Sequence, residues 1–154
     1  DEPVSLSAAR GLLPAEGRMT ALADVHEGLA TAVRTELPCD AYESDKLNPP
    51  CAQVVAPAYA PRLIFSGAKQ QYLFKVRVYG SRTELEATFE EMCKYREPHG
   101  AKSLVQAIEN ESLWTPGLID YAQVVNVGEF DVAEIPANSN AFYLWFDIDV
   151  EVVF

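Results

Sequence analysis

The chain ends on Phe142-Tyr143-Leu144-Trp145-Phe146-Asp147-Ile148-Asp149-Val150-Glu151-Val152-Val153-Phe154, in which apolar residues recur at every second position. Successive side chains of an extended chain point to opposite sides, so these apolar residues share one face. The opposite face carries Tyr143, Trp145, Asp147, Asp149 and Glu151. A period of two is the pattern of a strand with one buried face. The stretch therefore predicts a long closing strand that packs on one side only.

Upstream of this strand, helical and extended patterns follow one another. Apolar residues at spacings of three and four predict helices at Thr20 to Glu36, Thr83 to Tyr95, and from Ser103 to just before Trp114. In the second helix, the apolar stripe is Leu85, Phe89 and Met92. Extended patterns predict strands at Ala41 to Ser44, Ala52 to Ala56, Tyr72 to Tyr79, Ile119 to Glu129 and Phe130 to Ile135. Together these elements predict an α+β domain whose mostly antiparallel sheet packs on about three helices.

A long connection is predicted from Pro57 to Gln71, because prolines and glycine interrupt it. It contains three consecutive apolar residues, Leu63, Ile64 and Phe65, which fit either a strand or a loop. Connections of that length often carry function, and adjacent exposed apolar residues are usually covered by a partner. We therefore predict that Leu63, Ile64 and Phe65 contact a neighbouring subunit or another protein.

Composition limits the kinds of partner. The 154 residues include 12 basic and 23 acidic ones, for a formal charge of -11, which argues against binding the phosphates of nucleic acid. The three cysteines, at 39, 51 and 93, lack paired metal or redox spacing and are expected to be reduced thiols, as in a cytoplasmic protein. No apolar run reaches the length of a membrane span, and no signal peptide is recognised, so no membrane association is expected.

Candidates for catalysis or ligand binding are weak in this sequence. His26 and His99 have no partner at metal-ligand spacing, and the glycines follow no phosphate-binding pattern. Asp147, Asp149 and Glu151 could hold a divalent cation in principle, but no loop of EF-hand type and no His partner supports this, and a solvated or interface-facing strand surface is the better explanation. We therefore expect no catalytic residue, no cofactor and no metal.

Two large aromatic residues, Tyr143 and Trp145, share the polar face of the closing strand. Aromatic residues are enriched at the centres of interfaces, so both are candidates for contact with another subunit or protein. The alternative is that they pack under another part of the same chain.

Two further stretches carry a resemblance: Asn48-Pro49-Pro50-Cys51-Ala52-Gln53-Val54-Val55, and Gly100-Ala101-Lys102-Ser103-Leu104-Val105-Gln106-Ala107-Ile108-Glu109. With an initial helix before them and an alternating strand after them, the chain from Met19 to Phe154 resembles the tail terminator proteins of long-tailed bacteriophages. The order of the elements carries this resemblance. Residues 1–18 precede it and are expected to be a flexible extension; one hypothesis is that the natural start is Met19.

The resemblance implies a structural virion protein and not an enzyme. Family members form a ring, commonly of six copies, that caps the tail tube and ends its polymerisation. The ring also joins the tail to the head at the virion neck, after assembly in the bacterial cytoplasm. The implied partners are other copies of the chain, the major tail tube protein and the head-tail connector or stopper protein. Double-stranded DNA passes through the lumen without specific binding, and Asp147, Asp149 and Glu151 are candidates for a lumen lining that repels it.

Two alternatives stay open at this point. Another neck component, a head-tail stopper or an adaptor, is also a small ring-forming protein. Adaptors are largely helical and stoppers are expected to be compact β-barrels, so the central helices favour the terminator. An enzyme or small-molecule-binding domain of the α+β class would need a polar cluster that converges on a pocket.

Overall fold

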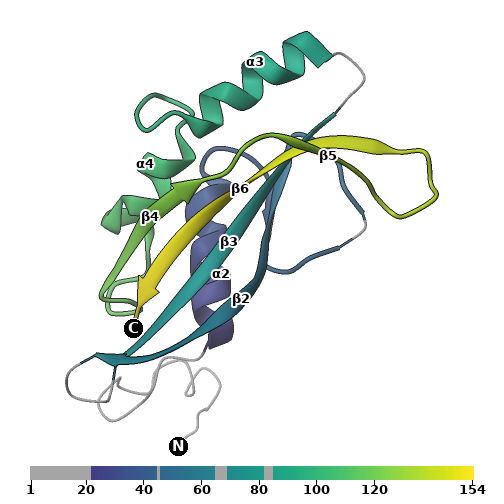
Figure 1. The fold of residues 1–154 in the computed structure, drawn as a ribbon. Helices are drawn as coiled ribbons and strands as arrows, with labels where there is room; N and C mark the ends of the chain where they lie inside the picture. Colours follow the sequence, from purple (N-terminus) through teal and green to yellow (C-terminus); the bar gives the residue numbers. More distant parts are fainter. Residues whose placement is uncertain (1–21, 45, 65–68, 82–84) are drawn as a thin grey trace, which may run out of the picture.

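The sheet is the centre of the computed structural model, which describes residues 22–44, 46–64, 69–81 and 85–154 (Figure 1). At 56–64 and 69–70 the description is of the backbone alone. Its six strands follow the order β1-β2-β3-β6-β4, and β5 pairs with β6 beside β4. Their bounds are β1 Cys39–Asp40, β2 Cys51–Ile64, β3 Lys69–Ser81, β4 Tyr121–Val127, β5 Asp131–Glu134 and β6 Phe142–Val153.

The predicted closing strand is present as β6, and it lies in the middle of this sheet. β6 pairs antiparallel with β3 from Tyr143 to Val153, and its other edge pairs with β4 and then β5. The short β1 runs parallel to β2, while every other pairing is antiparallel. The prediction of a mostly antiparallel sheet in an α+β domain is confirmed.

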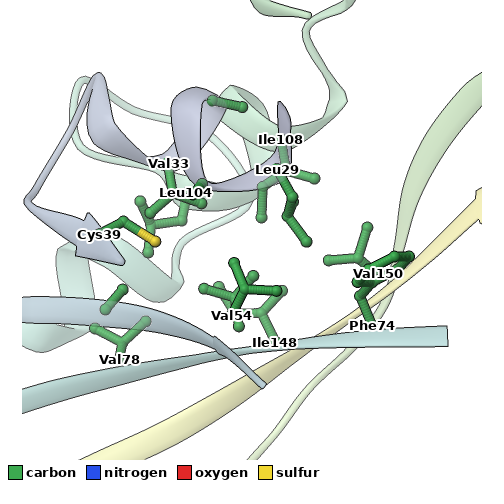
Figure 2. Close-up of a cluster of buried hydrophobic side chains, with 14 of the residues drawn as sticks. Leu29, Val33, Cys39, Val54, Phe74, Val78, Leu104, Ile108, Ile148 and Val150 are labelled. Carbon is green, nitrogen blue, oxygen red and sulfur yellow. The ribbon is translucent and has the colours of Figure 1, made fainter. Parts of the chain in front are cut away.

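Three α-helices lie in the described residues: α2 Leu22–Arg34, α3 Leu85–Arg96 and α4 Leu104–Glu109. A short 3-10 helix, η1 Glu111–Leu113, follows α4. The apolar face of the sheet packs against α2 and α4, as Figure 2 shows for the middle of the core. That core includes Leu29 and Val33 of α2, Leu104 and Ile108 of α4, and Val54, Phe74, Val78, Ile148 and Val150 of the sheet.

Close packing of α2 depends on Gly28. A Cβ atom at this position would lie 2.7 Å from Leu118 Cδ2 and 3.0 Å from Trp114 Cζ3. Trp114 is itself buried and donates a hydrogen bond of 2.9 Å from Nε1 to the carbonyl of Ile108. The segment after η1 therefore packs closely against α2, and Trp114 is part of the core.

The start of α4 is fixed by Ser103. Its hydroxyl accepts a hydrogen bond of 3.1 Å from the Gln106 backbone N–H, and it donates to the carbonyl of Glu97. The Gln106 side chain in turn accepts a hydrogen bond of 3.2 Å from the backbone N–H of Gly100. Ser103 and Gln106, at the spacing of a capping box, therefore both bind backbone N–H groups, and the Gln106 side chain reaches back to the turn before the helix.

Replacing Ser103 by Ala is expected to lower the free energy of unfolding by about 1 kcal/mol, because a backbone donor of α4 loses its acceptor. Urea denaturation measures this loss, and Ser103→Thr, which keeps the hydroxyl, should retain most of the stability. If Ala and Thr at this position were equally stable, the side-chain hydrogen bond would contribute nothing.

The prediction of a long connection between Pro57 and Gln71 is wrong over most of its length. β2 continues to Ile64 and β3 begins at Lys69, so the two strands form one long hairpin. The ladder shifts register between Val55 and Ala58 and again between Ala60 and Leu63. Each shift contains a proline, Pro57 or Pro61, which has no N–H for the ladder. The prolines interrupt the pairing locally and do not end the strand.

Three smaller predictions also differ from the structure. The extended residues before β2 are Cys39 and Asp40, and the strand predicted at Ala41 to Ser44 is absent. Two apolar residues assigned to buried faces are instead exposed, Phe89 of α3 by 46% and Phe142 of β6 by 43%. Phe142 begins β6 where that strand pairs with β5, and the ring of Phe89 contacts that of Phe130, the residue before β5. The predicted extension, residues 1–18, lies outside the described residues.

The cysteines are free thiols, as predicted, and Cys39 is buried in the core. Burial raises the pKa of the Cys39 thiol to about 12, although the nearby Arg34 opposes part of this effect. The thiol therefore stays neutral in the folded protein well above the pH at which it ionises in the unfolded chain. None of the described helices is long and apolar enough to cross a membrane.

Because Cys39 is buried, the free energy of unfolding is expected to depend on pH differently in the wild type and in a variant without this thiol. Since its pKa is raised on folding, its contribution is full below the unfolded value of 9.0 and is lost as pH rises towards about 12. Relative to Cys39→Ala, the wild type should lose about 2 kcal/mol of unfolding free energy between pH 8 and pH 11. Chemical denaturation of both proteins across this range measures the difference. Parallel pH profiles would contradict a buried, neutral thiol.

Candidate functional site

One face of the sheet turns away from α2 and α4, and the polar residues of the closing strand lie there. We call it the outer face and define it by the outward-pointing residues of β3, β6 and β4. Its middle holds the three carboxylates predicted as a lumen lining, each opposite a residue of β3. The pairs are Arg77 with Asp147, Lys75 with Asp149, and Leu73 with Glu151.

The Asp147 carboxylate forms the best ordered ion pair of the outer face. Arg77 donates from Nε to Oδ1 at 2.8 Å and from Nη2 to Oδ2 at 3.1 Å, a two-point contact. The side chains are only 26% and 15% exposed. The hydrogen bond to Asp147 raises the pKa of Arg77 further above its already high value. This pair is therefore a fixed part of the sheet surface.

The other two carboxylates are also held within the chain. Asp149 accepts from Lys75 Nζ at 3.0 Å and from Asn126 Nδ2 at 3.3 Å. Glu151 accepts a hydrogen bond from the Gln71 amide and another, of 3.3 Å, from the Tyr121 hydroxyl. Partial burial, together with the charge of Glu151 and the hydrogen bond to it, raises the pKa of Tyr121.

These contacts reduce the net negative charge that the three carboxylates present to solvent. Their charge is met by two cations, Lys75 and Arg77, so the set keeps one net negative charge. A strip of this kind repels DNA far less than three free carboxylates would. The lumen-lining assignment stays a prediction, but its electrostatic argument is weaker than the sequence indicates.

Tyr143 and Trp145 both pack on residues of their own chain. The Arg77 guanidinium lies 4.2 Å from the Trp145 ring centroid, a cation–π contact. Tyr143 meets Tyr79 edge to face, with ring centroids 6.1 Å apart. Trp145 Nε1 is buried yet donates to no described acceptor. Both aromatics are half-buried, so packing within the chain accounts for part of their surface and the predicted interface role stays untested.

The third predicted contact lies at the far end of the β2–β3 hairpin. Leu63 and Ile64 close the ladder opposite Gln70 and Lys69, while Phe65 lies outside the described residues. The hairpin places these residues at the end of the sheet, away from the β5–β6 turn (Figure 1). They are therefore part of a projecting element, whereas the sequence pattern left strand and loop equally open.

His26 is a core residue. It lies on the buried side of α2, its Nδ1 is 3.1 Å from the carbonyl oxygen of Ala41, and its ring stacks on Tyr42 with centroids 4.9 Å apart. His99 is exposed on the turn before α4. Within the part of the chain that the structure describes, histidine, cysteine and carboxylate side chains form no group of three that could hold a metal.

One pocket lies between α4, η1 and β4, with a volume of about 110 Å³. Trp114, Ile119 and Tyr121 are among its lining residues, and Glu109 on its rim accepts a hydrogen bond of 2.8 Å from the Val124 N–H. Pockets that enclose a small organic ligand are usually at least about 300 Å³ in volume. This hollow is too small for such a ligand.

The sequence patterns missed an exposed apolar surface at the β5–β6 end. Val132 and Phe142 are exposed by 39% and 43% on the face that elsewhere packs on helices. Phe89 of α3 is also exposed, and its ring centroid lies 5.0 Å from that of Phe130, the residue before β5. Periodicity marks these residues as apolar but does not reveal where the covering helices end, so no sequence signal separates them from the core.

Comparisons with known proteins add little to this description. No family model matches the chain, and a search of curated proteins finds no match. One solved structure aligns with 86% of this chain and 92% of that chain, at 14% sequence identity and a TM-score of 0.40. Similarity at that level carries no argument about function.

Proposed function

We propose that this chain is a tail terminator of a long-tailed bacteriophage, a structural virion protein without catalytic activity. In this role, copies of the chain, six in the commonest arrangement, form a ring on the end of the tail tube. The ring ends polymerisation of the tube protein and binds the connector or stopper protein of the filled head. The genome then passes through its lumen without being held.

The observation that carries the proposal is the order of the elements from Met19 to Phe154. The Asn48-Pro49-Pro50 turn leads directly into β2, Gly100 and Ser103 open α4, and the alternating strand closes the chain as β6. In each case the residues that carry the resemblance coincide with a structural boundary. A chance likeness of short motifs would not be expected to fall on these boundaries in the same order.

Two further features favour a structural role over binding of a small molecule. The described pocket is small, and the polar groups of the outer face are engaged with one another and do not converge on a cavity. A long hairpin and an exposed apolar surface lie at opposite ends of the sheet (Figure 1). These are surfaces that suit contacts between large partners.

The proposal is tested by disrupting the gene in the source phage and examining the particles by negative-stain electron microscopy. A terminator is expected to leave overlong tails without heads. Tails of normal length beside leaking or empty heads would identify a stopper or an adaptor instead. Normal virions would refute a role in the neck.

A further inference from the structure

The face of the sheet that carries the core, which we call the inner face, is only partly covered at its β5–β6 end. Val132 of β5 lies opposite the buried Leu144 and points to the same face. Phe130 reaches that face as well, because its ring meets the fully buried ring of Phe146 edge to face at 5.4 Å. Val132 is nevertheless 39% exposed. Apolar surface of the inner face therefore meets solvent at this end.

The helix α3 packs on this end of the inner face and leaves a second aromatic ring exposed. Gly80 of β3 makes room for the helix, since a Cβ atom there would lie 2.9 Å from the sulfur of Met92. The ring centroid of Phe89 lies 5.0 Å from that of Phe130, yet Phe89 is 46% exposed. Val132 follows two residues after Phe130 on the same face. An apolar strip therefore runs from α3 onto β5.

Three carboxylates border this apolar strip. On α3, Glu86 and Glu90 are exposed, and Glu86 lies one helical turn from both Phe89 and Glu90. At the β5 end of the strip, Glu134 lies on the inner face and accepts a hydrogen bond of 2.8 Å from the Asn140 backbone N–H. Among the side chains that the structure describes, no Lys or Arg forms an ion pair with any of these three carboxylates.

The strip and its border have the anatomy of a protein interface, with an apolar centre and a polar rim. Adjoining apolar side chains that stay exposed on a folded domain mark contact with a partner. The charge of the rim then specifies that partner, because carboxylates are best met by Lys or Arg. We call these six residues the α3–β5 surface: Glu86, Phe89, Glu90, Phe130, Val132 and Glu134.

A second copy of the chain does not supply the matching charge. The whole chain has a formal charge of -11. A symmetric contact through the α3–β5 surface would set the carboxylates of one copy against those of the other. Arg34, Lys75 and Arg77 are already paired with carboxylates of their own chain. The occupant that fits the surface is therefore a different protein.

We propose that the α3–β5 surface binds a segment of another protein in which apolar side chains adjoin Lys or Arg. The apolar side chains of that segment cover the centre of the surface, and its cations pair with the carboxylates of the rim. The inference goes beyond the proposed function, because it names the chemistry of a partner and would stand if the chain were not a tail terminator.

A synthetic peptide tests the proposal on the full chain. The probe is a short fluorescein-labelled peptide in which leucine and lysine alternate, and the comparison peptide has glutamate in place of lysine. Fluorescence anisotropy measures binding at about 0.15 M salt, where attraction between distant exposed charges is largely screened. The lysine peptide is expected to bind and the glutamate peptide is not.

A charge-reversed variant tests the rim. The variant is Glu86→Lys with Glu90→Lys, and it should weaken binding of the lysine peptide about tenfold or more. Its control, Asp24→Lys with Glu111→Lys, makes the same change in net charge at exposed positions on other elements and should bind like the wild type. Circular dichroism checks that both are folded. An equal loss in the control would overturn the proposal.

A second variant tests the apolar centre. Phe89→Ser should weaken binding of the lysine peptide about fivefold or more, because an aromatic contact surface is lost. The matched control is Val125→Ser, since Val125 of β4 is 50% exposed and lies outside the surface. Amide shifts in two-dimensional NMR spectra locate the peptide, and changes are expected at 86–93 and 130–134. Changes centred on the outer face, or no binding of the lysine peptide, would overturn the proposal.

Sedimentation velocity without peptide tests whether a second copy occupies the surface instead. Self-association that Phe89→Ser abolishes and Val125→Ser preserves would overturn the assignment to a different protein. Self-association that survives Phe89→Ser uses other surfaces and agrees with the proposal. The electron microscopy of the disrupted phage tests the terminator function separately, so the failure of one proposal is distinguishable from the failure of the other.

Discussion

Replacing Phe146 by Ala is expected to lower the free energy of unfolding by about 3–5 kcal/mol, because it opens a cavity at the centre of the core. The Phe146 side chain is fully buried on the central strand, opposite Val78 of β3. Its ring meets that of Phe130 edge to face at 5.4 Å, and the guanidinium of Arg96 lies 5.5 Å from its centroid. A domain of this size has only about 5–15 kcal/mol of stability, so the variant should be close to unfolding.

The same strand offers a matched control, since Phe142 is on the same face four residues away and is 43% exposed. Phe142→Ala should cost less, about 1–2 kcal/mol, because 43% of the Phe142 surface stays in water in the folded protein. Guanidinium denaturation at one fixed protein concentration compares the two variants. Equal losses would mean that the β5–β6 end is packed as tightly as the middle of the sheet.

The contrast between these two residues shows what a sequence pattern can and cannot predict. Alternation along β6 correctly predicts which residues share a face, since that depends only on the geometry of an extended chain. It cannot predict how far along the strand the helices reach, because that depends on the lengths and positions of α2 and α4. The exposure of Phe89 and Phe142 was missed for this reason.

The hairpin shows a second limit. Pro57 and Pro61 are breakers by local preference, yet the β2–β3 ladder resumes after each of them through a shift of register. Pairing over many rungs of β3 outweighs the hydrogen bond that each proline removes. Local sequence patterns also could not predict the partners of Asp147, Asp149 and Glu151, because these partners lie on strands far away in the sequence. Only the register brings a cation opposite Asp147 and another opposite Asp149.

That register makes Arg77 the second position at which a large effect is expected. Arg77→Met keeps an apolar stem over Trp145 but removes both hydrogen bonds to Asp147. The Asp147 side chain is 15% exposed and would be left as a half-buried carboxylate without its counter-ion. Removing one partner of a desolvated pair is costly, so we expect a loss of about 2–3 kcal/mol in the free energy of unfolding.

A double-mutant cycle separates the ion pair from the packing. Asp147→Leu alone leaves the guanidinium of Arg77 over Trp145 without its carboxylate, and a similar loss is expected. Arg77→Met with Asp147→Leu removes both charges, so the double variant should be more stable than the sum of the single losses predicts, by about 1–3 kcal/mol. Urea denaturation at low and high salt measures all four proteins. Additive losses would show that Arg77 and Asp147 contribute to stability independently of each other.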